Sequence, residues 1–206
     1  MQCAIDDPAR LAEACGEPYS EMLSIDLREG DPAYFRWFLA SLLYSKPIRE
    51  ESATKTYRLF LAEGLTSSAD IIRAGWDQLV DVLDRGGYRR YDYSTADRLL
   101  EICGRLQRDY GGSLDRLYME SSGEEDLEGR LEALGKGIGP VTVSIFLRDM
   151  RRVWPKINPQ PTDKIRKEMA ILGIDDIKKY AEDRGIDPVR LETALHRRSR
   201  HLLRVH

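Results

Sequence analysis

Apolar residues recur at helical spacing along most of the chain, and this pattern limits the fold more than any other feature. One run follows Asp31-Pro32, a favourable helix start, and places apolar side chains at i, i+3, i+4 and i+7: Phe35, Phe38, Leu39 and Leu42. Further runs of this kind span approximately residues 57–61, 76–83, 96–110, 143–154, 165–172 and 191–202, with a short helix near residues 176–184. No alternating strand pattern occurs, so the sequence predicts an all-α protein.

The length and composition are those of a globular protein. A chain of 206 residues, 42% of them hydrophobic, can form one domain or two closely packed lobes. No run of 18 apolar residues is present, so we expect no membrane span, and the first ten residues lack the apolar core of a signal peptide. The three cysteines, Cys3, Cys15 and Cys103, are too few and too scattered for a disulfide framework or a cysteine-rich metal site. These features predict a reducing, intracellular setting and a cytoplasmic location.

A glycine-rich run, residues 134–142 (LGKGIGPVT), separates two predicted helices. Gly137 and Gly139 permit a tight turn whose N–H groups point outward, and the helix that begins near Pro140 adds the positive end of its dipole. Such a hairpin can hold a phosphate oxygen. The alternative is a plain helix–helix turn with a glycine cap, because short Gly-x-Gly turns are common.

The net charge of −3 hides an uneven distribution along the chain. Residues 1–140 contain 17 Lys and Arg against 26 Asp and Glu, whereas residues 141–206 contain 15 against 9. The basic residues after the hairpin gather in two groups: Arg148, Arg151, Arg152 and Lys156, and then Arg197, Arg198, Arg200 and Arg204. A charge run is usually a solvated face. Beside a candidate phosphate-binding hairpin, it favours a nucleic-acid partner.

Val141 follows the hairpin directly, in the first turn of the next predicted helix. It lies about 200° around that helix from Val143, at roughly 100° per residue. This places it on the side of Ile145 and Arg148, away from the apolar stripe. We therefore expect Val141 to face the space beside a bound backbone.

Asp163 follows Thr162 at a second predicted helix start, where either residue could be the helix cap. In the functional interpretation, the Asp163 carboxylate stays ionised at the helix N-terminus. It would then stabilise a developing cation or orient a water molecule.

Several segments, in this order, resemble the helix-hairpin-helix superfamily of DNA glycosylases, of which endonuclease III is the best-known branch. Residues 38–46 (FLASLLYSK) are similar to the early helix that leads to the strand-wedging loop, and residues 86–88 with the helix from Thr95 are similar to the middle of the family. Residues 136–148 resemble the hairpin and its second helix, and their last part is similar to the archaeal type of 8-oxoguanine glycosylase. Asp163 stands where the family keeps its catalytic aspartate, 22 residues beyond Val141.

The resemblance implies a two-lobed helical glycosylase fold, a DNA-binding cleft between the lobes, and a damaged base flipped out of the duplex. Asp163 is the implied catalytic residue, because an ionised carboxylate lowers the barrier to base departure, which builds positive charge on the sugar. The residues implied in DNA binding are Lys136, Gly137, Gly139, Val141, Thr142, Lys46 and Arg148.

Two departures from the family narrow the expected chemistry. Bifunctional members carry a hairpin-helix lysine whose amine forms a Schiff base with the sugar, and Val141 stands at that position here. The family's C-terminal iron–sulfur cluster needs four cysteines, and no cysteine follows Cys103. We therefore expect a monofunctional glycosylase that uses water as the nucleophile, with no iron–sulfur cluster, no metal and no other cofactor.

Lys46, Trp37 and Tyr44 each allow two interpretations. Lys46 lies where the family inserts a side chain into the gap left by the flipped base, but a solvated lysine before Pro47 fits equally. Trp37 and Tyr44 are seven residues apart on one helix side and could line a base pocket. Core packing is the commoner fate of such aromatic residues.

The sequence suggests an N-terminal extension at residues 1–30 that packs on a glycosylase-like domain at residues 31–206. Within the whole, we expect an inner lobe of residues 40–150 and an outer lobe from residues 1–39 and 151–206. The expected partner is double-stranded DNA with a damaged base, bound by a nucleoid-associated monomer; alkylated purine, oxidised guanine and oxidised pyrimidine all fit. Two other classes stay open: a non-catalytic DNA-binding relative, and a helical protein-interaction module whose hairpin is only a turn.

Overall fold

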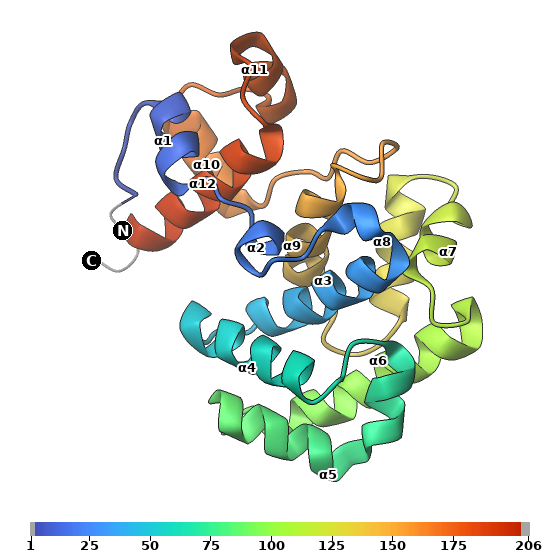
Figure 1. Ribbon diagram of the computed structural model, residues 1–206. Helices are drawn as coiled ribbons and strands as arrows, with labels where there is room; N and C mark the ends of the chain where they lie inside the picture. The colour runs from blue at the N-terminus through green and yellow to red at the C-terminus, as the bar shows by residue number, and fades with distance from the viewer. Residues whose placement is uncertain (1–2, 203–206) are drawn as a thin grey trace. The chain divides into compact units, whose positions relative to one another are not determined.

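The computed structural model describes residues 3–202, the last two by their backbone only, and every regular element in this range is a helix (Figure 1). The prediction of an all-α protein is therefore confirmed for this part of the chain. Arg204 lies outside the described residues. The helices are α1 (Pro8–Cys15), α2 (Tyr19–Met22), the 3-10 helix η1 (Leu27–Glu29), α3 (Asp31–Tyr44), α4 (Glu50–Ala62), α5 (Ser68–Gly86), α6 (Asp92–Tyr110), α7 (Leu114–Met119), α8 (Glu124–Ala133), α9 (Pro140–Met150), α10 (Asp163–Ile171), α11 (Ile177–Arg184) and α12 (Pro188–Leu202).

Local sequence signals account for several helix ends. Pro32 occupies the first turn of α3, where its missing N–H leaves no helical hydrogen bond unmade. Gly87 and Gly111 follow α5 and α6 in the left-handed conformation, with φ of 101° and 65°. Gly75, with φ of 72°, interrupts α5, so the predicted run at residues 76–83 is the second half of a kinked helix.

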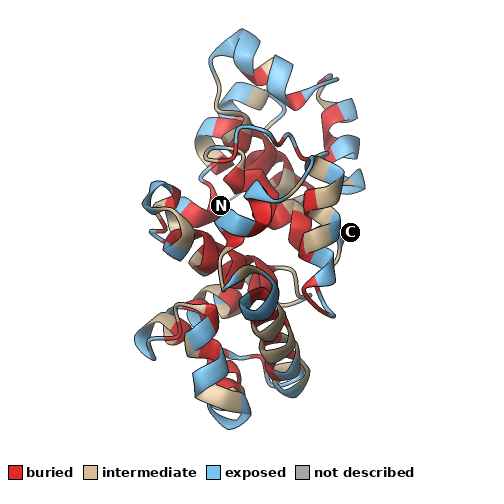
Figure 2. Ribbon diagram, turned by 90° about the vertical axis from the view of Figure 1, so that its right-hand side faces the viewer, coloured by how far each residue is buried: buried red, intermediate tan, exposed pale blue. Residues whose placement is uncertain are grey.

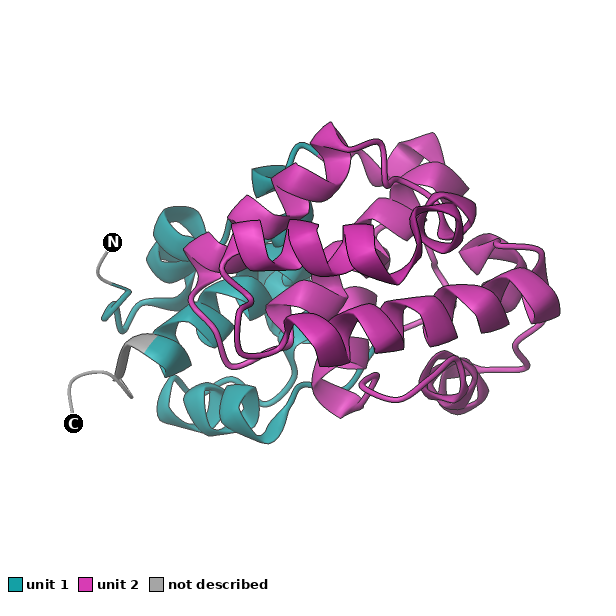
Figure 3. Ribbon diagram, turned by 90° about the horizontal axis from the view of Figure 1, so that it is seen from below, with its two compact units in different colours: residues 1–24, 158–206 teal, residues 25–157 magenta. Residues whose placement is uncertain are grey.

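The chain divides into two compact units, shown in separate colours in Figure 3. Unit 1 is formed by Met1–Ser24 and Asn158–His206, and unit 2 by Ile25–Ile157. The hairpin and α3 to α9 belong to unit 2, whereas Asp163 and α10 to α12 belong to unit 1. None of the helices within residues 3–202 is both long and apolar enough to cross a bilayer.

The core of unit 2 forms around α3, which is apolar on nearly all sides and therefore buried along most of its length. Figure 2 shows buried residues in red and exposed ones in pale blue along the described helices. Phe38 of α3 packs edge-on against Phe146 of α9, with ring centroids 5.3 Å apart. Trp154 continues this aromatic cluster: its ring stacks on Tyr118 at 4.5 Å and meets Phe146 at 5.6 Å. The hairpin helix α9 is thus held by the centre of the core.

Unit 1 is built from both parts of the chain that form it, because α1 packs against α12 and α12 also contacts α10. Their shared core contains Leu11, Ile165, Leu191 and Leu195, each at most 1% exposed. Arg198 of α12 is buried with them and forms ion pairs with Glu168 of α10 and Asp6 before α1. This buried cation therefore ties three segments of unit 1 together.

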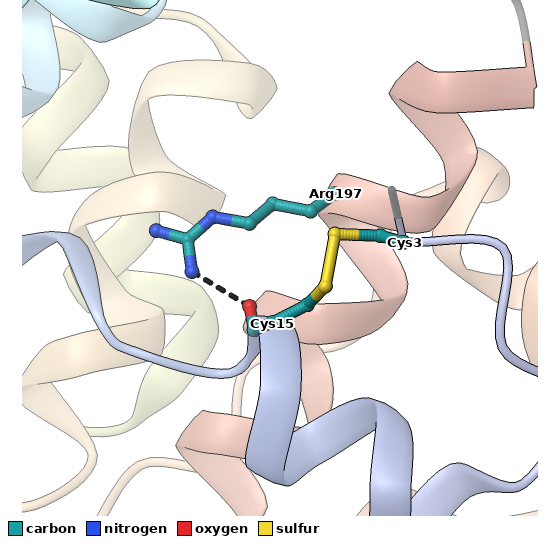
Figure 4. Close-up of a disulfide and its surroundings, with 3 residues drawn as sticks. All are labelled: Cys3, Cys15 and Arg197. Carbon is teal, nitrogen blue, oxygen red and sulfur yellow. Dashed lines mark hydrogen bonds between the residues drawn. A yellow bond between two sulfur atoms is a disulfide. The ribbon is translucent and has the colours of Figure 1, made fainter. Parts of the chain in front are cut away.

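A disulfide joins Cys3 to Cys15, with their Cα atoms 6.2 Å apart (Figure 4). The expectation drawn from the cysteine count is wrong for this pair, because α1 turns the chain so that two cysteines 12 residues apart meet. The guanidinium of Arg197 donates a 2.6 Å hydrogen bond to the carbonyl of Cys15 beside it. Only Cys103 is unpaired, and it is buried. The cysteines therefore lend no support to the expected reducing setting.

Candidate nucleic-acid interface at the glycine hairpin

The turn between α8 and α9 depends on one of its glycines for its conformation. Gly137 has φ of +99°, in the left-handed region that side chains other than glycine rarely adopt. Gly139 has φ of −129° and ψ of −177°, an extended conformation open to any residue. Of the two glycines that we expected to be conformationally special, only Gly137 is.

The hairpin presents unused backbone donors. The amides of Gly137, Gly139 and Val141 donate no hydrogen bond within residues 3–202. α9 begins at Pro140 after Gly139 with no side-chain cap, so its first N–H groups are not satisfied by the helix. The Val141 side chain is 55% exposed, as its position after the hairpin predicts. These donors, at the positive end of a helix dipole, form a surface suited to an anion.

The turn is held in place from inside. Leu134 and Ile138 are buried, and the Thr142 hydroxyl donates to the carbonyl of Gly137 at 3.4 Å. Gly135 lies so close to α6 that an added Cβ would come within 2.8 Å of the Ile102 side chain. The Thr142 side chain, which is 2% exposed, therefore closes the turn and does not itself face a ligand.

Two cationic side chains meet at Gly137. A Cβ built on Gly137 would lie 2.8 Å from Cδ and 3.3 Å from Nε of Arg98, and 3.4 Å from Nζ of Lys46. Lys46 comes from the turn after α3, and Arg98 from the second turn of α6. Burial lowers the pKa of Lys46, and the positive charge of Arg98 lowers that pKa further. Lys136, also expected at this site, is exposed on the turn.

Arg98 was not anticipated as a site residue. It precedes Leu99 on the solvent side of an apolar stripe, where a charged residue is the ordinary choice. Its closeness to Gly137, 39 positions further along the chain, arises only from the packing of the hairpin on α6. No local pattern in the sequence signals that contact.

Arg148 does not belong to this surface, which corrects its assignment as a DNA-binding residue. Its side chain is 1% exposed, and its Nε lies 3.3 Å from Oδ1 of Asp149. Ile145 is only 7% exposed, so the side of α9 that was expected to face outward below Val141 is buried. α9 is enclosed on more than one side, and helical periodicity alone distinguishes one apolar stripe from the remaining face.

Trp37 and Tyr44 lie in the core of unit 2, as the packing interpretation predicts. Trp37 is fully buried, and its indole Nε1 donates a 3.0 Å hydrogen bond to the carbonyl of Phe146. Tyr44 is 8% exposed, and its hydroxyl lies 2.5 Å from that of Thr54. The Trp37 ring therefore supports the hairpin helix and is not open to a base.

Asp163 is the first residue of α10 in unit 1. Thr162 is the cap residue, but neither its side chain nor that of Asp163 makes a capping hydrogen bond, so the capping interpretation of Asp163 is wrong. The carboxylate is 85% exposed and forms an ion pair with Arg166, one turn later. It is thus accessible to solvent at the positive end of a helix.

Within residues 3–202, no group of three or more His, Cys, Asp or Glu side chains is arranged to hold a metal ion. Comparisons of the sequence and the structure with protein-family models, with curated proteins and with solved structures found no match.

Proposed function

We propose that this chain is a DNA-repair glycosylase of the helix-hairpin-helix type, which binds double-stranded DNA through the glycine hairpin and releases a modified base. The observation that carries the proposal is the set of unused amide donors at Gly137, Gly139 and Val141, in an exposed turn at the start of α9. Backbone donors of this kind contact phosphates without regard to base sequence. A repair enzyme needs such contacts, because its lesion occurs in any sequence.

The proposed reaction is a monofunctional hydrolysis. The N-glycosidic bond breaks and the base departs with the bonding electrons, which leaves positive charge on the sugar. The Asp163 carboxylate stabilises that charge, and water adds to the anomeric carbon. The proton that this water loses is taken up by the departed base, or by solvent where an alkylated base leaves as a neutral molecule. Val141 cannot form a Schiff base, so the DNA strand stays intact after base release.

A panel of lesions tests this proposal. Duplexes with one alkylated purine, one 8-oxoguanine or one oxidised pyrimidine are incubated with excess protein and analysed with and without alkali. The expected result is strand breakage only after alkali, which reveals an abasic site. Asp163→Asn should abolish base release, whereas Asp175→Asn, a change at another exposed aspartate of unit 1, should not. Unchanged release by the Asp163 variant would remove its catalytic role.

The second candidate is a DNA-binding protein that keeps the hairpin without the chemistry. The Asp163–Arg166 ion pair favours it, because a carboxylate that already has a cationic partner is a weaker stabiliser of a sugar cation. This candidate predicts duplex binding that falls steeply with salt and no base release from any lesion. Release from even one lesion would exclude it.

A further inference from the structure

Lys46 and Arg98 form a pair of cations without an anion. Neither side chain makes an ion pair or a hydrogen bond within the described residues. Arg105 of the same helix as Arg98, by contrast, lies 3.4 Å from Glu101 and donates to the carbonyl of Ala133. Lys46 and Arg98 come from different segments of the chain, and both side chains lie beside Gly137.

The pair lies against the part of the hairpin that has unused donors. Both side chains are partly buried, and both reach within 3.4 Å of the point where a Gly137 side chain would begin. Two like charges that lie near one another repel, and the repulsion is stronger where both are partly removed from water. An anion bound between them would neutralise this repulsion and would also accept hydrogen bonds from the adjacent amide N–H groups.

We propose that Lys46 and Arg98 together bind one phosphodiester group of the DNA backbone at Gly137. This inference rests on the DNA binding proposed above and assigns Lys46 a different role from the one implied by the family resemblance. The ammonium is directed to the hairpin, where it is a phosphate ligand and not a wedge in the gap left by a flipped base. Arg98 supplies planar donors that match phosphate oxygens, and Lys46 supplies a compact charge. The absence of a side chain at Gly137 leaves room for both.

The test measures binding to an undamaged duplex and to the same duplex with an abasic-site analogue, by fluorescence anisotropy over a series of KCl concentrations. Lys46→Met and Arg98→Met should each weaken binding to both duplexes by about tenfold, the effect of one lost charged contact. Each should reduce the slope of log K against log [salt] by about 1. Because both residues contact one phosphate, the double variant should lose less than the product of the two single losses.

The controls match the substitutions in chemistry. Lys55→Met and Arg108→Met remove the same charges from exposed positions on α4 and α6. They should change the slope of log K against log [salt] much less than Lys46→Met and Arg98→Met do. Lys46→Arg keeps the charge and should retain most of the affinity. Circular dichroism and urea unfolding of each variant show whether a loss of binding reflects a loss of fold.

Each outcome has one meaning. If Lys46→Met weakens only the abasic duplex and leaves the salt slope unchanged, Lys46 is a wedge and the proposed phosphate site is wrong. If the wild type binds DNA and all variants bind equally well, the site is wrong while the proposed function stands. If the wild type binds no duplex, both proposals fail. The melting temperature is also measured in inorganic phosphate and in KCl of equal ionic strength. If phosphate raises it and the protein binds no duplex, the site belongs to a small phosphate compound and the DNA assignment is overturned.

Discussion

Tyr88 donates a 2.6 Å hydrogen bond from its phenolic hydroxyl to the main-chain carbonyl of Leu43, 45 residues earlier in the chain. Both residues are fully buried. The same carbonyl also accepts from the amide of Lys46, at 3.4 Å. Tyr88 therefore fixes the end of α3 and the turn that carries Lys46 to the hairpin.

Tyr88→Phe is expected to lower the free energy of unfolding by about 1–2 kcal/mol, because a buried hydrogen bond is lost while the ring still fills its space. Duplex affinity should fall as well, since the turn that holds Lys46 becomes less rigid. Urea unfolding and anisotropy measure the two effects. Tyr93→Phe is the matched control: Tyr93 is 61% exposed, and the change should affect neither quantity. An unchanged stability of the Tyr88 variant would contradict the role given to this bond.

Gly137→Ala should destabilise the protein by about 1–3 kcal/mol, because alanine is strained at a φ of +99°. Its Cβ would lie 2.8 Å from Cδ of Arg98, so it would also displace Arg98 and weaken duplex binding. Gly139→Ala should be tolerated, since Gly139 is extended and no atom lies within 4 Å of its added Cβ. Thermal melts and binding curves of the two variants provide the comparison, and equal effects at both positions would refute it.

Lys46→Met is expected to raise the stability of the unbound protein at neutral pH, because burial and Arg98 disfavour the charged form of Lys46 in the folded state. The pKa of Lys46 is lowered from 10.5 by burial and by Arg98, so the folded state binds fewer protons than the unfolded state between the lowered pKa and 10.5. Across this window, Lys46 makes the free energy of unfolding rise with pH. The free energy of unfolding of the wild type should therefore rise relative to that of the variant as the pH approaches 10.5, and urea unfolding over a pH series measures this trend.

The Cys3–Cys15 disulfide should stabilise unit 1 by about 2–4 kcal/mol, through the constraint that it places on the unfolded chain. Calorimetry of the wild type with and without dithiothreitol, and of the Cys3→Ala/Cys15→Ala double variant, measures this contribution. The reductant should not affect the variant.

A count of reactive thiols tests the same bond. Burial raises the pKa of Cys103 to about 12, so the oxidised native protein should show no reactive thiol and the unfolded protein should show one. Three reactive thiols after unfolding without reductant would show that the bond is absent.

Val141→Lys should create strand-cleaving activity if the hairpin positions DNA as proposed. Val141 is 55% exposed, so the change should alter stability by no more than about 0.5 kcal/mol. The expected product is a protein–DNA adduct trapped by borohydride on an abasic duplex, formed by the variant and not by the wild type. Met119→Lys, at a 63% exposed position on α7, controls for non-specific amine chemistry. Equal trapping by both lysine variants would argue against a specific position.

Local patterns in the sequence predicted the elements that local physics determines. The run from Phe35 to Leu42 identified α3, and the run at residues 96–110 identified most of α6. Contacts between distant segments could not be predicted in this way, because they depend on how the helices pack. Arg98 reaches Gly137 only because the hairpin packs on α6, and Arg148 is buried because α9 is enclosed on more than one side. Periodicity identifies an apolar stripe but not how many neighbours surround the helix.

The discontinuous construction of unit 1 has a consequence for synthesis. α1 packs on α12, and residues 25–157 lie between their two parts of the chain. At 5–20 residues per second, a ribosome needs on the order of ten seconds to produce that insert. During this interval, the apolar side chains Leu11 and Ala12 have no partner helix, and at its end unit 2 has all of its residues. Unit 2 can therefore fold first, and the order of translation makes the assembly of unit 1 a late step.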